Sequence, residues 1–123
     1  MTIRILKSKI TPLLHQFQFF KNSKHVGHCK TIIKGKGAIL SDLEIYDPYK
    51  KQGFGSQFLQ KTEALLKNDF DVEDVSLLAW QPTTGFEVVD FFKKNNYLQN
   101  STNVGHYDDY VTLFDLHQMR KTL

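Results

Sequence analysis

The first part of the chain alternates between apolar and polar positions, which is the pattern of β-strands with one buried face. It predicts four successive strands, over residues 3–9, 16–21, 26–34 and 38–46. Asn22-Ser23-Lys24 and Gly35-Lys36-Gly37 separate the last three of these strands and have the composition of tight turns. Because such short connections join antiparallel neighbours, residues 16–46 are predicted to form an antiparallel meander.

The hydrophobic period changes at Gly53. Apolar side chains then recur every three or four residues, which predicts an amphipathic helix through about Lys67. Residues 75–80 are apolar and β-prone, so they predict a strand that is buried on both faces. A second helical stripe covers residues 86–92 and ends at Asn95-Asn96. Two closing strands are expected at 97–99 and 110–116, around a polar segment at 100–109.

This order of elements implies a mixed sheet with helices on its faces, in the α/β or α+β class. The 123 residues are enough for one domain, and neither a repeat nor a Pro/Ser-rich linker divides them. With 41% hydrophobic and 24% charged residues, the composition excludes an intrinsically disordered chain.

A single cysteine, Cys29, cannot form an internal disulfide, and we expect it to be buried and inert. Together with the absence of an apolar run long enough to cross a bilayer and of a signal-peptide pattern, this predicts a cytoplasmic protein without a membrane partner. No Cys/His spacing suits a metal. The net charge of +3 suits an anionic ligand and is too small to demand nucleic acid.

The stretch from Leu43 to Ser56 carries the most chemical information. It runs from a strand through a basic loop, with Lys50 and Lys51, into a helix that opens with Gly53 and Gly55. Backbone N–H groups and the positive dipole end at a helix start attract anions, and glycines let a phosphate approach the backbone. The alternative is an ordinary tight strand-to-helix turn with solvated lysines. The stretch is neither a P-loop nor a dinucleotide fingerprint.

This stretch resembles the acetyl-CoA-binding motif of the GNAT N-acetyltransferase superfamily, Arg/Gln-x-x-Gly-x-Gly/Ala after a strand. Lys50 stands at the Arg/Gln position, and Gly53 and Gly55 stand at the two small positions. Residues 88–97, Val-Val-Asp-Phe-Phe-Lys-Lys-Asn-Asn-Tyr, resemble the second motif of that superfamily, roughly Ala-x-x-Phe-Tyr-x-x-x-Gly-Phe. The resemblance covers about residues 38–100.

The resemblance implies a single acetyltransferase domain over residues 1–123, with a mostly antiparallel sheet of six to seven strands and helices on both faces. It implies acetyl-CoA as the acetyl donor and no metal. The pantetheine arm would be held by the backbone of residues 43–45 and the diphosphate by residues 50–56. The implied cofactor-binding residues are Leu43, Glu44, Ile45, Lys50, Lys51, Gln52, Gly53, Phe54, Gly55, Ser56 and Phe92.

Transfer to an amine requires a neutral amine, so a carboxylate base would assist. Asp42 and Glu44 are the candidates, because residues two apart on a strand project from the same face. In diamine acetyltransferase-like members, which this region resembles slightly, a Glu-Asp pair precedes the strand end; here Ser41 replaces the Glu. The alternative is that both acids are solvated or paired with strand lysines. Trp80 matches an Ala-Trp of those members and would line the substrate pocket, unless it is simply a core residue.

Three departures from the family pattern affect the mechanism. Phe92 stands where many members carry the tyrosine that protonates the CoA thiolate, which leaves Tyr97, Tyr107 and Tyr110 as alternative acids, with Tyr97 better suited to the core. Asn96 replaces a glycine, which is a mild change because Asn tolerates the left-handed conformation. Residues 10–15 are too few for the two helices that usually wall the acceptor site. The acceptor region would therefore be open, or completed by a second subunit in a homodimer.

The function expected is an acetyl-CoA-dependent N-acetyltransferase that acts directly on a primary amine of a small molecule, polyamine or protein. One alternative is a non-catalytic CoA-binding or protein-interaction member of the same fold. A small basic nucleic-acid binder is a further alternative, disfavoured because most aromatic residues fall at core spacing. His25, His28 and His106 are expected to be ordinary surface histidines.

Overall fold

The computed structural model describes residues 3–50, 52–82, 87–107 and 113–123. By its internal contacts the chain forms two compact units, residues 1–75 with 123, and residues 76–122. In order, its elements are β1 (Ile3–Lys9), β2 (Leu14–Lys21), β3 (Lys24–Lys34), β4 (Gly37–Ile45), the short 3₁₀ helix η1 (Asp47–Tyr49), α1 (Phe54–Phe70), β5 (Asp74–Pro82), α2 (Glu87–Lys94), β6 (Leu98–Tyr107) and β7 (Leu113–Thr122).

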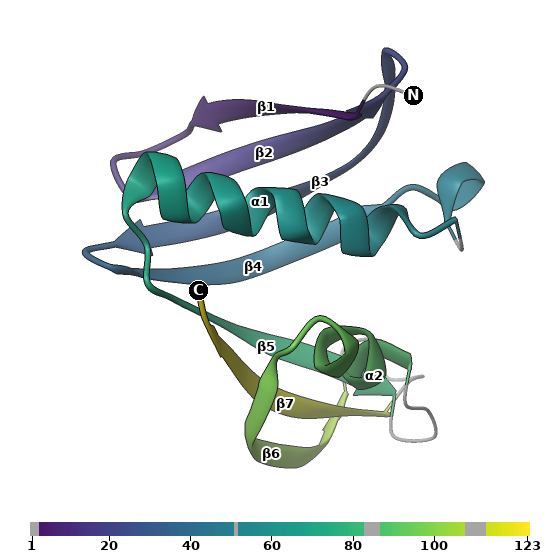
Figure 1. Cartoon of the computed structure of the whole chain (residues 1–123). Helices are drawn as coiled ribbons and strands as arrows, with labels where there is room; N and C mark the ends of the chain where they lie inside the picture. Colours follow the sequence, from purple (N-terminus) through teal and green to yellow (C-terminus); the bar gives the residue numbers. More distant parts are fainter. Residues whose placement is uncertain (1–2, 51, 83–86, 108–112) are drawn as a thin grey trace. The chain divides into compact units, whose positions relative to one another are not determined.

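In the first unit, β1, β2, β3 and β4 pair in sequence order, each antiparallel to the next. The predicted meander is therefore confirmed, and β1 joins it through a short connection from Lys9 to Leu14. Figure 1 shows α1 lying across one face of these strands. Three side chains of β2 contact this helix, since Phe19 meets Phe58, and Phe17 and His15 both meet Phe70.

The core of the first unit lies between α1 and this face of the sheet. Phe19 stacks on Phe58 with 4.5 Å between ring centroids, and neither residue is exposed. The helix is longer than expected, because Phe70 still packs against β2. The buried residues of this layer are Phe17, Phe19, Val26, Cys29, Thr31, Ala38, Leu40, Phe58, Leu59, Thr62 and Leu66. Burial of this apolar stripe is what holds the helix on the sheet.

A register shift between Lys30 and Thr31 interrupts the pairing of β3 with β4. Lys30 pairs with Asp42 and Thr31 pairs with Leu40, so Ser41 is the additional residue of a β-bulge. The Ser41 hydroxyl donates a hydrogen bond to the Lys30 carbonyl oxygen at 3.2 Å. Beyond the bulge, Leu43 pairs with the buried Cys29, whereas Asp42 and Glu44 point away from α1.

In the second unit the strands lie in the order β5, β7, β6. Two predictions were wrong here. The β5 strand is not buried on both faces: Leu77 and Ala79 are buried, while Leu78 and Trp80 are 46% and 44% exposed. The polar segment 100–109 was expected to be a loop, but β6 runs through Tyr107. Register shifts between Gln99 and Ser101 and between Asn103 and His106 interrupt the alternation of inward and outward side chains. A strand of this kind therefore does not show a regular period of two in its sequence.

The Gln81 side chain positions the start of α2. Its buried Oε1 accepts hydrogen bonds from the backbone N–H groups of Val88 at 2.6 Å and Val89 at 3.1 Å. At the other end of the helix, Phe92 packs edge-to-face on Tyr97 with 5.5 Å between ring centroids. Tyr97 is only 1% exposed, so its predicted core position is confirmed.

The described residues thus show the predicted mixed α/β class, with seven strands, mostly antiparallel, and two α-helices among them. Within the described ranges, neither helix combines the length and the apolar character that a membrane crossing requires.

Candidate active site

The junction between β4 and α1 is a loop that folds back on itself. Tyr46 extends the pairing past the end of β4, because its N–H donates to the Val26 carbonyl oxygen at 2.8 Å. The Tyr49 N–H then donates to the Tyr46 carbonyl oxygen at 2.8 Å, and the Gln52 side-chain amide donates to the Pro48 carbonyl oxygen at 3.2 Å. The loop therefore has a defined path up to the helix, apart from Lys51, which lies outside the described residues.

The residue immediately before α1, Gly53, has a backbone conformation that favours glycine. Gly53 has φ 80° and ψ 4°, in the left-handed region that residues with a Cβ rarely adopt. A glycine has no side chain to cap the first turn, and Phe54, Gly55 and Ser56 bring no carboxylate to it. The positive end of the α1 dipole is therefore not neutralised by an acid of its own first turn, as an anion site requires.

A hollow of about 200 Å³ opens beside this helix start. The β2–β3 hairpin contributes Lys21, Asn22 and Lys24 to it, and the loop contributes Tyr49 and Gln52. The Lys21 ammonium lies 4.3 Å from the centre of the Phe54 ring, in a cation–π contact. Lys21 and Lys24 were missed in the sequence, because nothing in a hairpin turn indicates that it lies next to a helix that begins thirty residues later.

Gly27 controls how closely β3 approaches the end of β4. A Cβ at this position would lie 2.2 Å from the Glu44 carbonyl oxygen and 3.1 Å from the Ile45 Cα. The close approach thus occurs at Glu44 and Ile45, two of the three residues whose backbone the resemblance assigns to the pantetheine arm. The hydrophobic pattern does not indicate this close approach, since a lone glycine within a strand pattern has several explanations.

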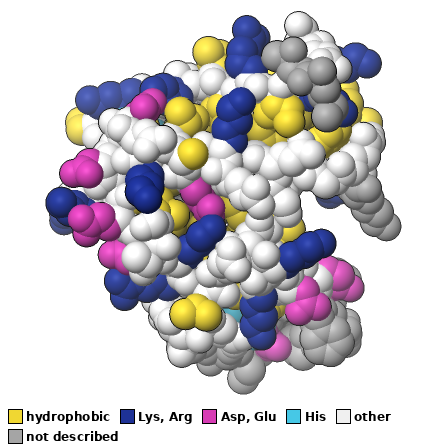
Figure 2. All heavy atoms as spheres, in the orientation of Figure 1, with side chains coloured by type: hydrophobic (Ala, Val, Ile, Leu, Met, Phe, Trp, Pro, Cys, Tyr) yellow, Lys and Arg dark blue, Asp and Glu magenta, His cyan; other side chains and the backbone are white. Residues whose placement is uncertain are grey.

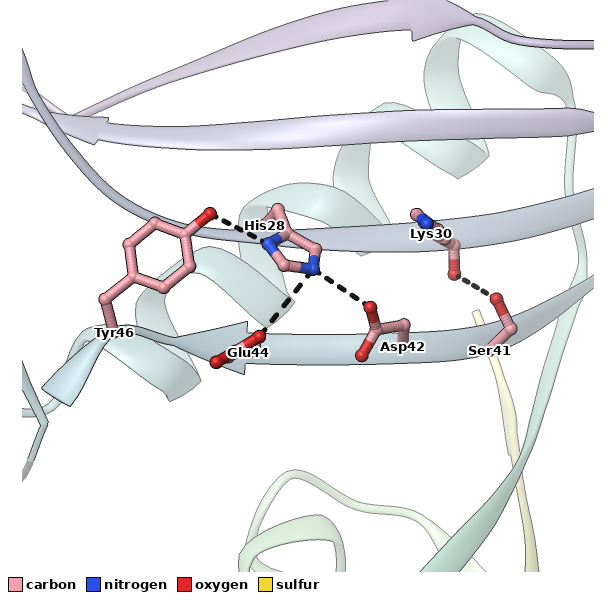
Figure 3. Close-up of polar contacts among 6 residues, drawn as sticks. All are labelled: His28, Lys30, Ser41, Asp42, Glu44 and Tyr46. Carbon is pink, nitrogen blue, oxygen red and sulfur yellow. Dashed lines mark hydrogen bonds and ion pairs between the residues drawn. The ribbon is translucent and has the colours of Figure 1, made fainter.

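Asp42 and Glu44 meet a histidine rather than a lysine. His28 Nε2 lies 2.9 Å from Asp42 Oδ2 and 3.9 Å from Glu44 Oε2, while His28 Nδ1 lies 2.9 Å from the Tyr46 hydroxyl oxygen (Figure 3). The His28 side chain is 16% exposed, against 46% for Asp42 and 53% for Glu44. The prediction that His28 is an ordinary surface histidine was wrong, because cross-strand pairing places it between the two acids and Tyr46.

Burial and the negative charges of Glu44 and Asp42 raise the pKa of the Tyr46 hydroxyl above its usual value. The hydroxyl therefore stays protonated at neutral pH and can donate a hydrogen bond. His25 and His28 both contact the Tyr46 ring, with centroids 5.1 Å and 5.7 Å away. The candidate acids thus belong to a connected group of side chains on the face of β3 and β4 that points away from α1.

Cys29 does not belong to this group. It is fully buried toward α1, and burial raises the pKa of its thiol to about 12. Since the thiolate is the reactive form, this cysteine is unsuited to carry an acyl group. The prediction of a buried, inert cysteine is confirmed.

Trp80 and Phe92 belong to the second unit. Trp80 is 44% exposed, so it is not a core residue, and its role in a substrate pocket stays a prediction. Phe92 is buried against Tyr97, and its predicted contact with the cofactor also stays a prediction. The side chains of His106, Tyr107 and Tyr110 lie outside the described residues. In the described part of the chain, no three His, Cys, Asp or Glu side chains are grouped so that they could hold a metal.

Comparisons with known proteins address the fold as a whole. No model of a protein family and no curated protein matches the sequence. Solved structures do match. A GNAT family acetyltransferase from Elizabethkingia anophelis with acetyl-CoA bound is 12% identical, with a TM-score of 0.77 over 98% of both chains. A Bacillus subtilis acetyltransferase in complex with CoA is 9% identical, with a TM-score of 0.77 over 99% of both chains.

A third match is the spermidine/spermine N-acetyltransferase of Vibrio cholerae, which is 10% identical with a TM-score of 0.79. There the alignment covers 92% of this chain and 67% of the other. These similarities extend over nearly the whole chain, well beyond the two motifs that first indicated them. The chain therefore has the fold of the GNAT acetyltransferases.

Proposed function

We propose that this protein is an acetyl-CoA-dependent N-acetyltransferase that transfers the acetyl group directly to a primary amine. The observation that carries the proposal is the β4–α1 junction, where a left-handed Gly53 opens a helix whose first turn brings no acid. The same fold holds acetyl-CoA in the Elizabethkingia anophelis structure and CoA in the Bacillus subtilis structure.

The residues of the junction fit a diphosphate. The first turn of α1 offers N–H groups and positive potential, and Lys50 and Lys51 add charge in the loop. Lys21 and Lys24 extend that charge around the adjoining hollow. The pantetheine arm would run along the backbone of Leu43, Glu44 and Ile45. The diphosphate would lie at residues 52–56.

The acceptor would lie on the face of β4 that carries Asp42 and Glu44. An amine with a pKa of about 10.4 is almost entirely protonated at pH 7, so it must lose a proton before it can attack the thioester. These carboxylates would assist that proton transfer, either directly as a base or by acting on a neighbouring side chain. A spermidine/spermine acetyltransferase among the structural neighbours makes a polyamine one acceptor to test, beside peptides with a free amine. We also infer that the protein works in the cytoplasm and that a second copy completes the acceptor region.

Calorimetric titration with acetyl-CoA tests the proposal. We expect micromolar affinity, about −8 kcal/mol, for the wild type. The Gly55→Glu substitution places a carboxylate in the first turn of α1 and should weaken binding by more than about 100-fold. Ala64→Glu adds the same charge at an exposed position of the same helix and should leave the affinity unchanged. No binding by the wild type, or equal binding by Gly55→Glu, would contradict the proposal.

The hairpin lysines give a second test of the anion site. The double substitution Lys21→Gln, Lys24→Gln should lower the acetyl-CoA affinity by about tenfold at low salt, and the loss should shrink as salt screens the charges. Lys30→Gln, Lys34→Gln removes the same charge from exposed positions of β3 that do not line the hollow. If both double variants bind alike, Lys21 and Lys24 do not contact the phosphates.

The rival function is a non-catalytic member that binds CoA without turnover, which the phenylalanine at position 92 favours. It predicts binding in the titration and no CoA release with any amine. A nucleic-acid binder is less well supported, because Figure 2 shows Lys and Arg side chains interspersed with Asp and Glu on the face displayed rather than gathered in one basic patch.

A further inference from the structure

Tyr46, His28 and Asp42 form a continuous line of hydrogen bonds across β3 and β4. The Tyr46 hydroxyl lies 2.9 Å from His28 Nδ1, and His28 Nε2 lies 2.9 Å from Asp42 Oδ2 (Figure 3). Each residue is held by the strand pairing, since Glu44 lies opposite His28 and Asp42 lies opposite Lys30. A hydroxyl, an imidazole and an orienting carboxylate in hydrogen-bond reach of one another are the components of a proton-transfer unit.

The hydrogen-bonding capacity of the three groups fixes the direction of the protons. An ionised carboxylate only accepts, so the His28 Nε2 must carry the hydrogen that it shares with Asp42. In a neutral imidazole the Nδ1 then holds a lone pair, and the Tyr46 hydroxyl donates to it. The resting arrangement is therefore Tyr46 O–H to Nδ1, and Nε2–H to Asp42.

The charged groups around His28 come mainly from β4. The β4 strand contributes Asp42 and, 3.9 Å from Nε2, Glu44. The only cation of β3 on this face next to His28 is Lys30, which lies opposite Asp42 in the pairing. His25 reaches the Tyr46 ring, and β2 places the neutral Gln18 directly opposite His28. Two carboxylates thus face the imidazole from the β4 side.

We propose that the Tyr46 hydroxyl takes the proton of the acceptor amine and that His28 receives the hydroxyl proton in the same step. Asp42 then acts as the positioning residue that holds the imidazole, rather than as the base itself, and Glu44 stabilises the imidazolium. This inference rests on the proposed acetyltransferase function, and it goes beyond that function because it assigns the proton to a histidine on β3.

The step balances. The amine nitrogen forms a bond to the acetyl carbon, and the carbon–sulfur bond breaks so that the sulfur leaves as the CoA thiolate with the bonding electrons. The amine enters this step in its neutral form, having released its first proton to water. As the nitrogen–carbon bond forms, one remaining N–H proton goes to the Tyr46 oxygen, and the Tyr46 proton goes to His28 Nδ1. The imidazolium later returns its proton to water, and the thiolate takes one from water. The raised pKa of Tyr46 supports this order, because the hydroxyl never needs to ionise on its own.

Turnover and its pH dependence test the assignment. CoA release is measured with spermidine, a peptide with a free α-amine and a peptide with one lysine. We expect Tyr46→Phe and His28→Ala to lower kcat by about 100-fold, the usual size of a general-base contribution, with acetyl-CoA affinity unchanged. Imidazole added to His28→Ala should restore part of kcat. His15→Gln, a histidine substitution on the α1 face of β2, is the control and should change neither kcat nor its pH profile.

The state of the imidazole gives a readout that needs no turnover. Nitrogen NMR of the histidine rings should show that the neutral form of His28 carries its proton on Nε2, and Asp42→Asn should shift that proton toward Nδ1. A proton on Nδ1 in the wild type would overturn the proposal, because the hydroxyl of Tyr46 could not then donate to His28.

The results separate this inference from the function on which it rests. If the wild type turns over, and Tyr46→Phe and His28→Ala keep the same kcat and pH profile, the proposed proton transfer through Tyr46 and His28 is wrong. The acetyltransferase proposal would then still stand. Acetyl-CoA binding without turnover on any of the three amines would overturn the proposed proton transfer through Tyr46 and His28, and it would favour the non-catalytic member. An absence of acetyl-CoA binding by the wild type would overturn both.

Discussion

The two faces of β3 and β4 are built from the same short stretches of sequence and differ in nearly every physical respect. Toward α1 the strands present Cys29, Thr31, Ala38 and Leu40, none of them more than 5% exposed. On the opposite face they present His28, Asp42, Glu44 and Tyr46, which contact one another and stay partly exposed. One face holds the core, and the other gathers polar groups that contact one another.

This difference indicates where stability and chemistry reside. Burial of apolar side chains dominates the free energy of folding, whereas exposed ion pairs contribute about 0–1 kcal/mol. Changes on the α1 face should therefore alter the free energy of unfolding strongly. Changes on the polar face should alter it little, while they alter any reaction that occurs there.

The largest effect is expected at Phe58, the α1 residue that stacks on Phe19. Phe58→Ala should lower the free energy of unfolding by about 3–5 kcal/mol, because it removes a fully buried ring and leaves a cavity. Urea unfolding measures this. A loss below about 1 kcal/mol would mean that the two rings do not form the core of this unit.

A smaller loss of stability is expected at Gly27, the β3 residue that lies closest to the backbone at the end of β4. Gly27→Ala should cost about 2 kcal/mol, because its Cβ would lie 2.2 Å from the Glu44 carbonyl oxygen and force the strands apart. Gly37→Ala is the matched control, since its Cβ would lie 3.7 Å from the Lys34 carbonyl oxygen, an ordinary contact. Equal unfolding free energies for the two variants would refute the close approach.

The buried thiol of Cys29 predicts a loss of stability in alkali. Its pKa rises from about 9 to about 12 on folding, so between these pH values the unfolded chain binds fewer protons than the folded one. The free energy of unfolding must then fall as the pH rises. At pH 10 this fall should be about 1.4 kcal/mol larger than in a chain without the thiol. Urea unfolding of the wild type and of Cys29→Ala at pH 8 and pH 10 measures this difference. If both proteins lose the same free energy of unfolding between these pH values, the thiol is in contact with water.

The smallest effect on stability is expected on the polar face. Asp42→Asn should change the free energy of unfolding by less than about 1 kcal/mol, because the side chain is 46% exposed and its contact with His28 is partly solvated. The same substitution should alter the His28 tautomer and slow turnover. A loss comparable to that of Phe58→Ala would remove the distinction between the two faces.

Much of the fold could be predicted from the sequence because its strands and helices are regular. Alternation along residues 16–46 gave the meander, and the helical period after Gly53 gave α1. The prediction weakened where the pattern was interrupted. Bulges in β6 disrupt the alternation, so the pattern predicts a strand only as far as Gln99 and a polar segment where β6 continues to Tyr107. In β5, a short apolar run did not distinguish one buried face from two.

The candidate site could be predicted only as far as it is local in sequence. The residues of the β4–α1 junction are consecutive, so their spacing revealed a possible anion site. His28, Lys21, Lys24 and Gly27 reach the site through strand pairing and hairpin geometry, which no spacing reports. Asp42 and Glu44 were correctly placed on one face, but their partner on the neighbouring strand was assigned to the surface.

The additional residue at Ser41 allows β4 to carry a buried leucine at 40 and an outward aspartate at 42. In an uninterrupted strand, residues two apart share a face, so Leu40 and Asp42 would compete for the same side. The bulge shifts this alternation by one residue, so Leu40 points toward α1 while Asp42 and Glu44 point away from it. Deleting Ser41 should restore regular pairing of β3 with β4 while Leu40 stays buried and Asp42 stays outward, so the inserted residue is dispensable for deciding which side chains face the solvent.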